Sequence, residues 1–144
     1  MPEGVPVDHP IEVTWEGGMR YRGGRPGGPS LVVDGNSEAG PTPVDTLIIA
    51  MASCSAIDVV DYLEKRRTPP TSVRVFVQFS RAPSPPRRVT QARLTFHVAA
   101  DSPLEHVERA AQLSFDKYCS VSNSLAPDTE LSFDVQLSPA AAEG

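Results

Sequence analysis

Residues 42–67, TPVDTLIIAMASCSAIDVVDYLEKRR, carry the signals that decide the fold of this chain. Thr42, Pro43 and Asp45 form the pattern of a helix start, because a threonine hydroxyl can cap a free backbone N–H and a carboxylate is stabilised beside the positive end of the helix dipole. Three cationic residues close the stretch, and two prolines that cannot continue a helix follow it. The stretch therefore predicts one long helix with both ends defined.

The interior of this predicted helix is apolar in every direction. Between Leu47 and Val60 no polar stripe marks a solvent side, which predicts that the helix is buried on most of its sides. Asp58 and Asp61 interrupt the apolar run before it reaches the roughly 20 residues that a bilayer-spanning helix needs. We therefore expect the central helix of a soluble fold, not a membrane helix, with Cys54 inside it.

Length and charge limit the class of protein. A chain of 144 residues suits one domain with a sizeable core, so we expect a single domain over residues 1–144. The 13 Lys and Arg residues against 18 Asp and Glu residues give a net charge of −5, which provides no field to hold a polyanion. Nucleic acid is therefore not an expected partner.

The N-terminal residues MPEGVPVDHP lack the basic start and the apolar run of a signal peptide, so we expect the protein in a reducing cytoplasm. Cysteines in that compartment are more often chemical than structural. The other interpretation of Cys54, taken alone, is a small and inert buried hydrophobe. His97 is expected at the surface, and His9 and His106 lie far apart in the sequence with no ligand spacing between them, so a metal site is not expected. No bound cofactor is expected either.

Alternating apolar and polar side chains predict strands on both sides of the helix. Before the helix, residues 11–16 and 19–22 predict a hairpin around Gly17-Gly18, with Arg20 and Arg22 on one face. The further predicted elements are a strand at 31–33, strands at 73–79 and 91–98, a helix that starts at a Ser102-Pro103 cap and keeps Leu104, Val107, Ala111, Phe115 and Tyr118 on one face, a short further turn, and a last strand at 129–137.

This order of elements predicts an α+β fold, in which a mostly antiparallel sheet packs on the buried central helix and on the amphipathic second helix. One small sheet and one amphipathic helix offer too little surface to cover a helix that is apolar all round. A second copy of the chain is the natural source of the missing cover, so we expect an obligate homodimer.

The two cysteines, Cys54 and Cys119, are too far apart in the sequence for a CxxC redox motif or a zinc knuckle. Each lies among few competing polar groups, so the two could meet as a catalytic dithiol. A thiol is a nucleophile only as thiolate, and a buried one needs a nearby cation to offset its desolvation. Arg20 and Arg22 are candidates for this cation, with Arg25 as a third; the alternative is that these arginines are solvated.

Asp45 also has two interpretations. It is placed to close the cap of the long helix, where a carboxylate is favoured. Its carboxylate could also hold an arginine guanidinium in a bidentate pair. We therefore keep Asp45 among the candidate site residues.

Two motifs resemble a known family. The first runs from GPTPVD at residues 40–45 through AMASCSAIDVV at residues 50–60, and the second is KYCSVSNSL at residues 117–125. In this order and spacing they resemble the family of the osmotically inducible protein OsmC and the organic hydroperoxide resistance protein Ohr, over essentially the whole chain. The resemblance implies an intertwined homodimer of the OsmC-like fold, with two sites at the subunit interface.

The resemblance also implies roles for the site residues. Cys54 corresponds to the peroxidatic cysteine and Cys119 to the resolving cysteine, while an arginine from the N-terminal region activates the first and a carboxylate orients that arginine. Ohr-type members carry an acid directly after the proline of the first motif, whereas this chain has Val44 there and its acid at Asp45. That pattern resembles the OsmC-like branch of the family.

Together these features predict a thiol-dependent peroxidase that reduces organic hydroperoxides in oxidative or osmotic stress. The Cys54 thiolate would become a sulfenic acid, Cys119 would condense with it to a disulfide, and a dithiol reductant would restore both thiols. The alternative is a non-catalytic OsmC-like binding module or thiol redox sensor, which Val44 in place of the expected acid favours.

Overall fold

A computed structural model describes residues 10–142. Residues 1–9, which include His9, and residues 143–144 lie outside the described part. The chain groups into two compact units, one ending at Leu47 and the other beginning at Ile48, and each is described by itself. The prediction of a single domain stays a prediction. In chain order the elements are β1 (Glu12–Trp15), β2 (Arg20–Gly24), β3 (Ser30–Asp34), α1 (Pro43–Lys65), β4 (Ser72–Arg81), β5 (Val89–Ala99), α2 (Leu104–Leu113), a π-helical turn (Ser114–Tyr118), a 3-10 turn (Ser122–Ser124) and β6 (Glu130–Ser138).

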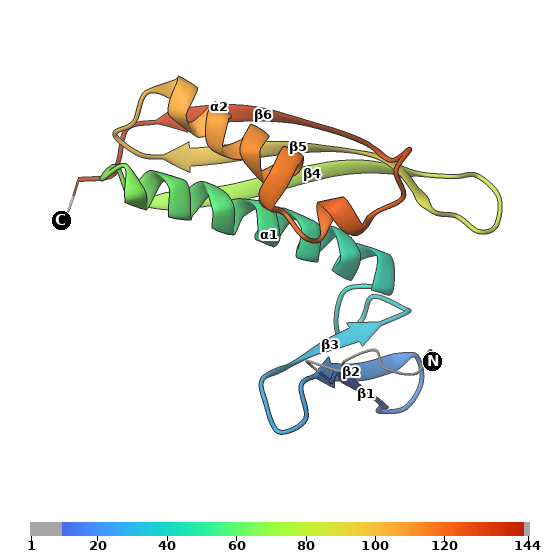
Figure 1. The fold of residues 1–144 in the computed structure, drawn as a ribbon. Coiled ribbons are helices and arrows are strands. Elements are labelled where there is room, and N and C mark those ends of the chain that lie inside the picture. Colours follow the sequence, from blue (N-terminus) through green and yellow to red (C-terminus); the bar gives the residue numbers. More distant parts are fainter. Residues whose placement is uncertain (1–9, 143–144) are drawn as a thin grey trace, which may run out of the picture. The chain divides into compact units, whose positions relative to one another are not determined.

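The first unit contains a three-stranded antiparallel sheet in the order β1-β2-β3 (Figure 1). The predicted hairpin is confirmed: Trp15 pairs with Tyr21, and both Gly17 and Gly18 have the positive φ that a tight turn between the strands requires. The predicted short strand is also confirmed, because β3 pairs with β2 along its full length.

The two faces of this sheet differ in polarity, because side chains alternate along each strand. Arg20 and Arg22 share the polar face, as predicted. The other face is apolar and largely exposed within the described residues: Val13 and Trp15 are each 64% exposed, Leu31 is 51% exposed and Tyr21 is 42% exposed. Exposed apolar faces of this kind are typical of interaction surfaces.

The long helix α1 begins and ends as predicted. The Asp45 N–H donates to the Thr42 hydroxyl at 3.1 Å, which is the expected N-cap bond. At the other end Arg67 has φ of +61°, the Arg67 N–H donates to the Glu64 carbonyl, and the Thr68 N–H donates to the Leu63 carbonyl. This is a Schellman motif, with an arginine where glycine is the usual residue.

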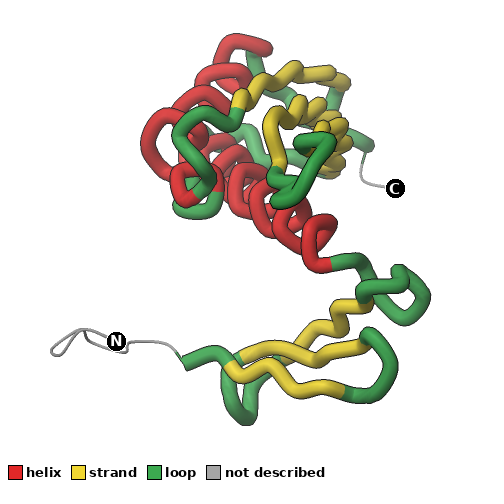
Figure 2. Tube along the Cα trace, turned by 90° about the vertical axis from the view of Figure 1, so that its right-hand side faces the viewer, coloured by secondary structure: helices red, strands yellow, loops and turns green. Residues whose placement is uncertain are grey.

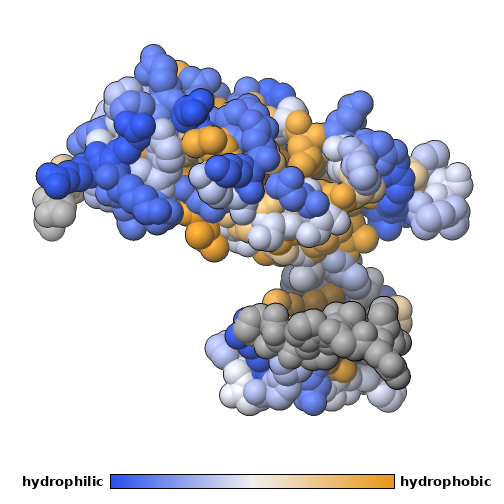
Figure 3. Space-filling model, in the orientation of Figure 1, coloured by the Kyte–Doolittle hydropathy of each residue, from blue (hydrophilic) through white to orange (hydrophobic). Residues whose placement is uncertain are grey.

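Within a single chain, α1 is buried on one side. Only one stripe is buried, at the helical spacing of Ile48, Met51, Ser55, Val59 and Leu63. The opposite side remains open, with Ile49 53% and Ile57 66% exposed. The reason is that the sheet and α2 cover a single side of the helix. Figure 3 shows apolar atoms at the surface of the second unit, along the side on which α1 runs.

By length and composition alone, α1 could cross a membrane, since its mean hydropathy reaches 1.6 over the most apolar window. A central helix of a soluble fold passes the same test. The carboxylate of Asp58 is hydrogen-bonded within the fold, and the buried stripe packs on a sheet. We therefore interpret α1 as an element of this fold.

The second unit contains a sheet in the order β4-β5-β6. The strands β4 and β5 pair antiparallel, as expected for two strands joined by a short loop, whereas β6 runs parallel to β5 because α2 lies between them in the sequence. Three of the four strand pairings within residues 10–142 are therefore antiparallel, which confirms the predicted α+β class with mostly antiparallel pairing.

The core of this unit lies between the sheet and its two helices, which Figure 2 shows on the same side of the strands. The inward side chains of β5 include Leu94 and Phe96, which are fully buried. The Phe96 ring meets Phe133 of β6 edge-on at 6.3 Å, and Phe133 stacks on Phe115 at 5.7 Å. These rings fix the end of α2 against the sheet.

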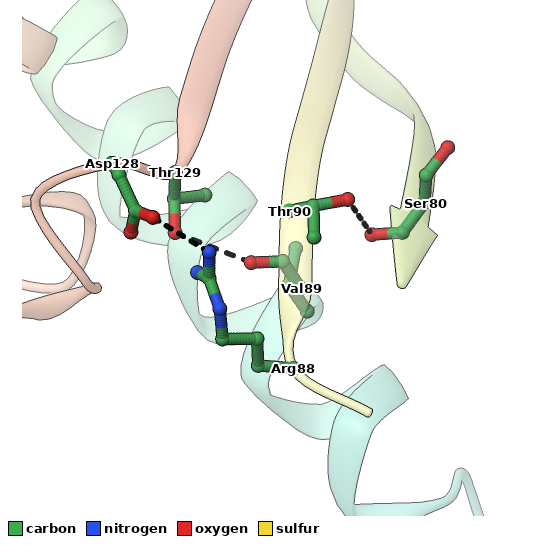
Figure 4. A network of polar contacts seen from close by, with 6 residues as sticks. All are labelled: Ser80, Arg88, Val89, Thr90, Asp128 and Thr129. Atoms are coloured by element: carbon green, nitrogen blue, oxygen red, sulfur yellow. Dashed lines mark hydrogen bonds and ion pairs between the residues drawn. The ribbon is translucent and has the colours of Figure 1, made fainter. Parts of the chain in front are cut away.

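Polar contacts join the three strands at one end of the sheet (Figure 4). The Arg88 guanidinium pairs with Asp128 at 2.7 Å, and the Thr129 hydroxyl donates to the Val89 carbonyl at 3.2 Å. The Thr90 hydroxyl donates to the Ser80 carbonyl of β4 at 3.3 Å. The entry of the chain into β6 is thus tied to β5 and β4.

The second helix departs from its predicted pattern at both ends. Ser102 makes no cap, because Pro103 occupies the cap position and the Ser102 hydroxyl turns to the Pro103 carbonyl. Val107 and Ala111 are buried as predicted, but Leu104 is 43% and Tyr118 is 55% exposed. The π-helical turn explains Tyr118, since its extra residue breaks the 3.6-residue period and rotates this side chain outward.

Candidate thiol site

Cys54 lies in the middle of α1 and is a half-buried free thiol. It stands one residue before Ser55 of the buried stripe, so its side chain lies at the edge of the face that packs into the second unit. The sequence correctly placed it inside the long helix. What the sequence did not indicate is that part of its surface stays accessible within this unit.

Cys119 is brought to Cys54 by the second helix and the turn that follows it. The helix α2 runs antiparallel to α1 (Figure 1), and the π-helical turn that continues it ends at Cys119. Cys119 then takes an extended conformation, with φ of −75° and ψ of 103°, and is fully buried. The Cys119 thiol lies within hydrogen-bond reach of the Cys54 thiol, so two cysteines that are far apart in the sequence lie side by side in the second unit.

Every polar group of Cys119 has a partner. Its N–H donates to the Ser114 carbonyl at 2.7 Å, and its carbonyl accepts from the Asn123 side-chain amide at 2.8 Å. Its sulfur accepts from the Ser122 N–H at 3.3 Å and faces the Met51 carbonyl of α1 at 3.9 Å. The position of this thiol is thus set by contacts on all sides.

The electrostatic setting of Cys54 disfavours its thiolate within the chain. Burial raises the pKa of the Cys54 thiol, and the neighbouring Cys119 raises it further. The backbone amides of Val121 and Ser120 act in the opposite direction, because an N–H group favours a negative charge on sulfur, but they do not outweigh burial. An additional positive charge is needed to make Cys54 a thiolate at neutral pH.

A half-buried hydrogen bond links α1 to the segment that carries Cys119. The Ser114 hydroxyl donates to a carboxylate oxygen of Asp58 at 2.7 Å, and Ser114 is fully buried. Asp58 lies one helical turn after Cys54. Neither Asp58 nor Ser114 is expected at the site from the sequence, although the i, i+4 spacing of Cys54 and Asp58 is a signal that these two side chains lie on the same side of the helix.

The predicted arginines and Asp45 lie in the first unit, and their contacts are described within it. Arg22 pairs with Glu16 at 3.1 Å and donates to the Ser30 hydroxyl at 3.2 Å, so its guanidinium is engaged within the first sheet. Arg20 is exposed and makes no ion pair with any residue between 10 and 142; its charge acts on Asp34. Asp45 serves the helix cap through its backbone N–H, and no arginine between residues 10 and 142 pairs with its carboxylate.

Other polar groups offer little to a metal. Within residues 10–142 no group of three His, Cys, Asp or Glu side chains lies close enough to hold an ion. The hydroxyl of Ser55 and the Nδ1 atom of His106 are buried without a hydrogen-bond partner in the described structure. His97, expected at the surface, is half-buried on the outer face of β5.

The fold and the site define an α+β protein with two free, adjacent cysteines between its long helix and the end of its second helix. The family model for the OsmC-like protein matches residues 34–134, which include both cysteines. This chain therefore belongs to the OsmC-like family, as its motifs indicated.

The relatives agree with this assignment. Protein YhfA of Escherichia coli strain K12 is 37% identical over 111 residues, which cover 76% of this chain and 83% of YhfA. An OsmC-like protein from Mycoplasma pneumoniae superposes with a TM-score of 0.77 at 12% identity, over 93% of this chain and 99% of its own. The organic hydroperoxide resistance protein OhrB of Bacillus subtilis superposes with a TM-score of 0.63 at 11% identity, over 90% of this chain and 98% of its own. Both of these solved structures therefore share the fold of this chain.

Proposed function

We propose that this protein is a cysteine-based peroxidase that reduces organic hydroperoxides with the Cys54 and Cys119 pair. The observation that carries the proposal is the proximity of the two thiols, one half-buried and one enclosed. A pair in which one sulfur is accessible and the other lies behind it suits a cycle in which the first is oxidised and the second resolves it.

The reaction has three balanced steps. The Cys54 thiolate attacks the distal oxygen of the hydroperoxide, the O–O bond breaks, and the alkoxide leaves as an alcohol after taking up a proton, so that Cys54 becomes a sulfenic acid. The Cys119 sulfur then attacks the Cys54 sulfur, a disulfide forms, and water leaves. A dithiol reductant reduces this disulfide by thiol–disulfide exchange and is itself oxidised to a disulfide.

The substrate class follows from the surroundings of Cys54. Aliphatic side chains of α1 flank it on both sides, and apolar surface gains roughly 25 cal/mol per Å² when a ligand buries it. An alkyl or aryl hydroperoxide therefore gains binding energy that hydrogen peroxide does not. The fold shared with a protein named for organic hydroperoxide resistance agrees with this substrate class.

The working unit in this proposal is a homodimer in a reducing cytoplasm. The open side of α1 and the apolar face of the β1-β2-β3 sheet are two surfaces that a second copy would cover. The same association would bring further charge toward Cys54, for which Arg20 and Arg22 are the candidates and Asp45 the candidate orienting acid.

A second function is favoured by one observation, the raised pKa of Cys54. A thiol that stays protonated reacts slowly, so the same fold would serve as a binding module or as a slow thiol redox sensor. Val44, where Ohr-type relatives carry an acid, points the same way. The rate of the first oxidation step separates the two functions.

The test is turnover of cumene hydroperoxide by the purified protein with dithiothreitol as the dithiol, beside Cys54→Ser and Cys119→Ser variants. The proposal expects loss of all turnover in Cys54→Ser. In Cys119→Ser it expects a Cys54 sulfenic acid that accumulates and is trapped by dimedone. Equal consumption of peroxide by the wild type and Cys54→Ser would refute the enzyme proposal.

A mass measurement after one equivalent of peroxide distinguishes the sensor from the enzyme. Rapid loss of two hydrogens to a Cys54–Cys119 disulfide is the result expected of the enzyme. Two thiols that persist for many minutes would instead support the binding module or sensor.

A further inference from the structure

A half-buried hydrogen bond joins two helical segments near the thiols. Ser114 donates its hydroxyl proton to Asp58 at 2.7 Å, and Ser114 has no exposed surface. Neither residue takes part in the chemical steps described above. A carboxylate that accepts a charge-assisted hydrogen bond forms a stronger and more directional link than a neutral pair of side chains would.

Ser114 is also the first residue of the π-helical turn that ends before Cys119. Its carbonyl accepts the Cys119 N–H at 2.7 Å, across five residues where an α-helix would span four. One residue therefore holds α1 through its side chain and Cys119 through its backbone. The extra residue of the turn directs Cys119 inward.

The other partner, Asp58, stands four residues after Cys54 on α1. Residues at this spacing lie on the same side of a helix, one turn apart. The helix turn that carries Cys54 therefore also carries the acceptor that holds the turn before Cys119. The two sulfurs are positioned from one short piece of α1.

We propose that Asp58 and Ser114 are positioning residues that hold the Cys119 thiol against Cys54 for disulfide formation. This inference rests on the proposed peroxidase function. It concerns the second step alone, in which the Cys119 sulfur bonds to the Cys54 sulfur, the S–O bond of the sulfenic acid breaks, and water leaves. The oxidant is the hydroperoxide of the first step, so no further reactant is needed.

The two steps depend differently on this contact. Attack on the peroxide needs only the Cys54 sulfur and its charge. Condensation needs the two sulfurs in contact with the right alignment, and a misplacement of about 1 Å can slow such a step by roughly 100-fold. Loss of the link should therefore slow disulfide formation and leave sulfenic acid formation close to its normal rate.

The experiment follows both steps in single turnover, by stopped-flow mixing of the reduced full-length protein with cumene hydroperoxide. The variants are Asp58→Ala, which removes the acceptor, and Asp58→Asn, which keeps an acceptor oxygen for the Ser114 hydroxyl. Gln112→Ala is the matched control, because its bond to Asp116 at 2.9 Å lies in the same segment but does not reach α1.

We expect Asp58→Ala to slow the peroxide-independent phase, which is disulfide formation, by about 10- to 100-fold. The phase that depends on peroxide concentration should hold its rate, and dimedone should trap more sulfenic acid. Asp58→Asn should recover most of the condensation rate, and Gln112→Ala should match the wild type. Ser114→Ala should resemble Asp58→Ala, and the double variant should be no slower than either single one, since both remove the same link.

A second measurement does not require peroxidase activity. Each variant is equilibrated in a glutathione redox buffer, and the ratio of disulfide to dithiol gives the effective concentration of the Cys119 thiol toward the Cys54 thiol. This concentration should fall by about 10-fold or more in Asp58→Ala and recover in Asp58→Asn. If the wild type forms no sulfenic acid with peroxide, the proposed function fails, and this equilibrium still decides the positioning role.

Two results would overturn the inference. One is an unchanged effective concentration and an unchanged condensation rate in Asp58→Ala. The other is an equal fall of both kinetic phases together with a lowered thermal midpoint, which Asp58→Asn shares; this pattern belongs to a purely structural hydrogen bond.

Discussion

Burial and proximity to a second thiol oppose the ionisation of the Cys54 sulfur. The pKa of this thiol is raised first by burial and then by Cys119, while the amides of Val121 and Ser120 offset part of the effect. Thiolate chemistry at neutral pH therefore requires a cation from outside the contacts described for this helix. Of the two candidates on β2, Arg22 is already engaged by Glu16 at 3.1 Å, and Arg20 is exposed.

We predict that Arg20→Ala raises the pKa of Cys54 more than Arg22→Ala does. A cation within about 4–6 Å lowers the pKa of an acidic group by roughly 1–3 units, so its removal should raise the midpoint by a similar amount. The measurement is the rate of iodoacetamide alkylation against pH in a Cys119→Ser background, which leaves one thiol to react.

Arg74→Ala on the outer face of β4 serves as the control, and its midpoint should equal that of the parent. If Arg22→Ala alone moves the midpoint, the roles of the two arginines are reversed. If neither substitution moves it, no arginine of the first sheet activates Cys54.

At the scale of the elements, the loop between β3 and α1 is held by hydrogen bonds from backbone N–H groups to one buried side chain. The loop from β3 to α1 is organised around Asp34, which is only 2% exposed. Its two carboxylate oxygens accept the Asn36 N–H at 2.8 Å and the Ala39 N–H at 2.9 Å. Gly40 follows, where a Cβ atom would come within 2.4 Å of the Val32 carbonyl. The loop therefore needs both the acid and the glycine.

We predict a pH-dependent loss of stability that belongs to this loop. The Ala39 and Asn36 N–H groups lower the pKa of Asp34 below its ordinary value of 3.8, and the charge of Arg20 adds to this effect. A carboxyl with a lowered pKa stabilises the folded state fully above the unfolded pKa, and this contribution is lost as the pH falls through the folded pKa. The acid-sensitive range therefore lies below about pH 4.

The measurement is the urea midpoint between pH 7 and pH 2.5 for the wild type and Asp34→Asn. Asparagine has one side-chain oxygen, so it can replace only part of the two hydrogen bonds that the Asp34 carboxylate accepts from Asn36 and Ala39. The variant should therefore be less stable at pH 7, and its stability should depend less on pH in the acid range. Asp128→Asn removes an exposed ion pair and should change the midpoint little. Identical acid profiles for the wild type and Asp34→Asn would show that the loop does not contribute.

At the scale of the whole molecule, the open side of α1 is the outstanding feature. Burial on most sides, which the sequence predicts for this helix, is not reached within a single chain, and Ile57 is 66% exposed in the middle of it. Exposed apolar residues in a continuous helix face are typical of association surfaces. The proposed homodimer would bury them.

We predict that Ile57→Glu converts a dimer into a monomer, because the association would bury an unpaired carboxylate. The measurement is the mass in solution by light scattering after size exclusion. Phe76→Glu is the matched control, since Phe76 is 59% exposed but lies on the outer face of β4, and this variant should stay dimeric. A wild-type protein that is monomeric at micromolar concentration would contradict the homodimer.

The sequence by itself determined the elements and the family, because these depend on local signals: the cap and end of α1, the alternation in the strands, and the two cysteine motifs. Only the tertiary structure decided the π-helical turn, the outward rotation of Tyr118, the parallel pairing of β6 and the link between Asp58 and Ser114. The physical reason is that each of these depends on contacts between segments far apart in the chain. Helical periodicity describes one helix by itself and carries no information about its contacts with other segments. The hydrogen bond from Ser114 to α1 and the extra residue of the π-helical turn are such contacts and their result, and together they hold Cys119 beside Cys54.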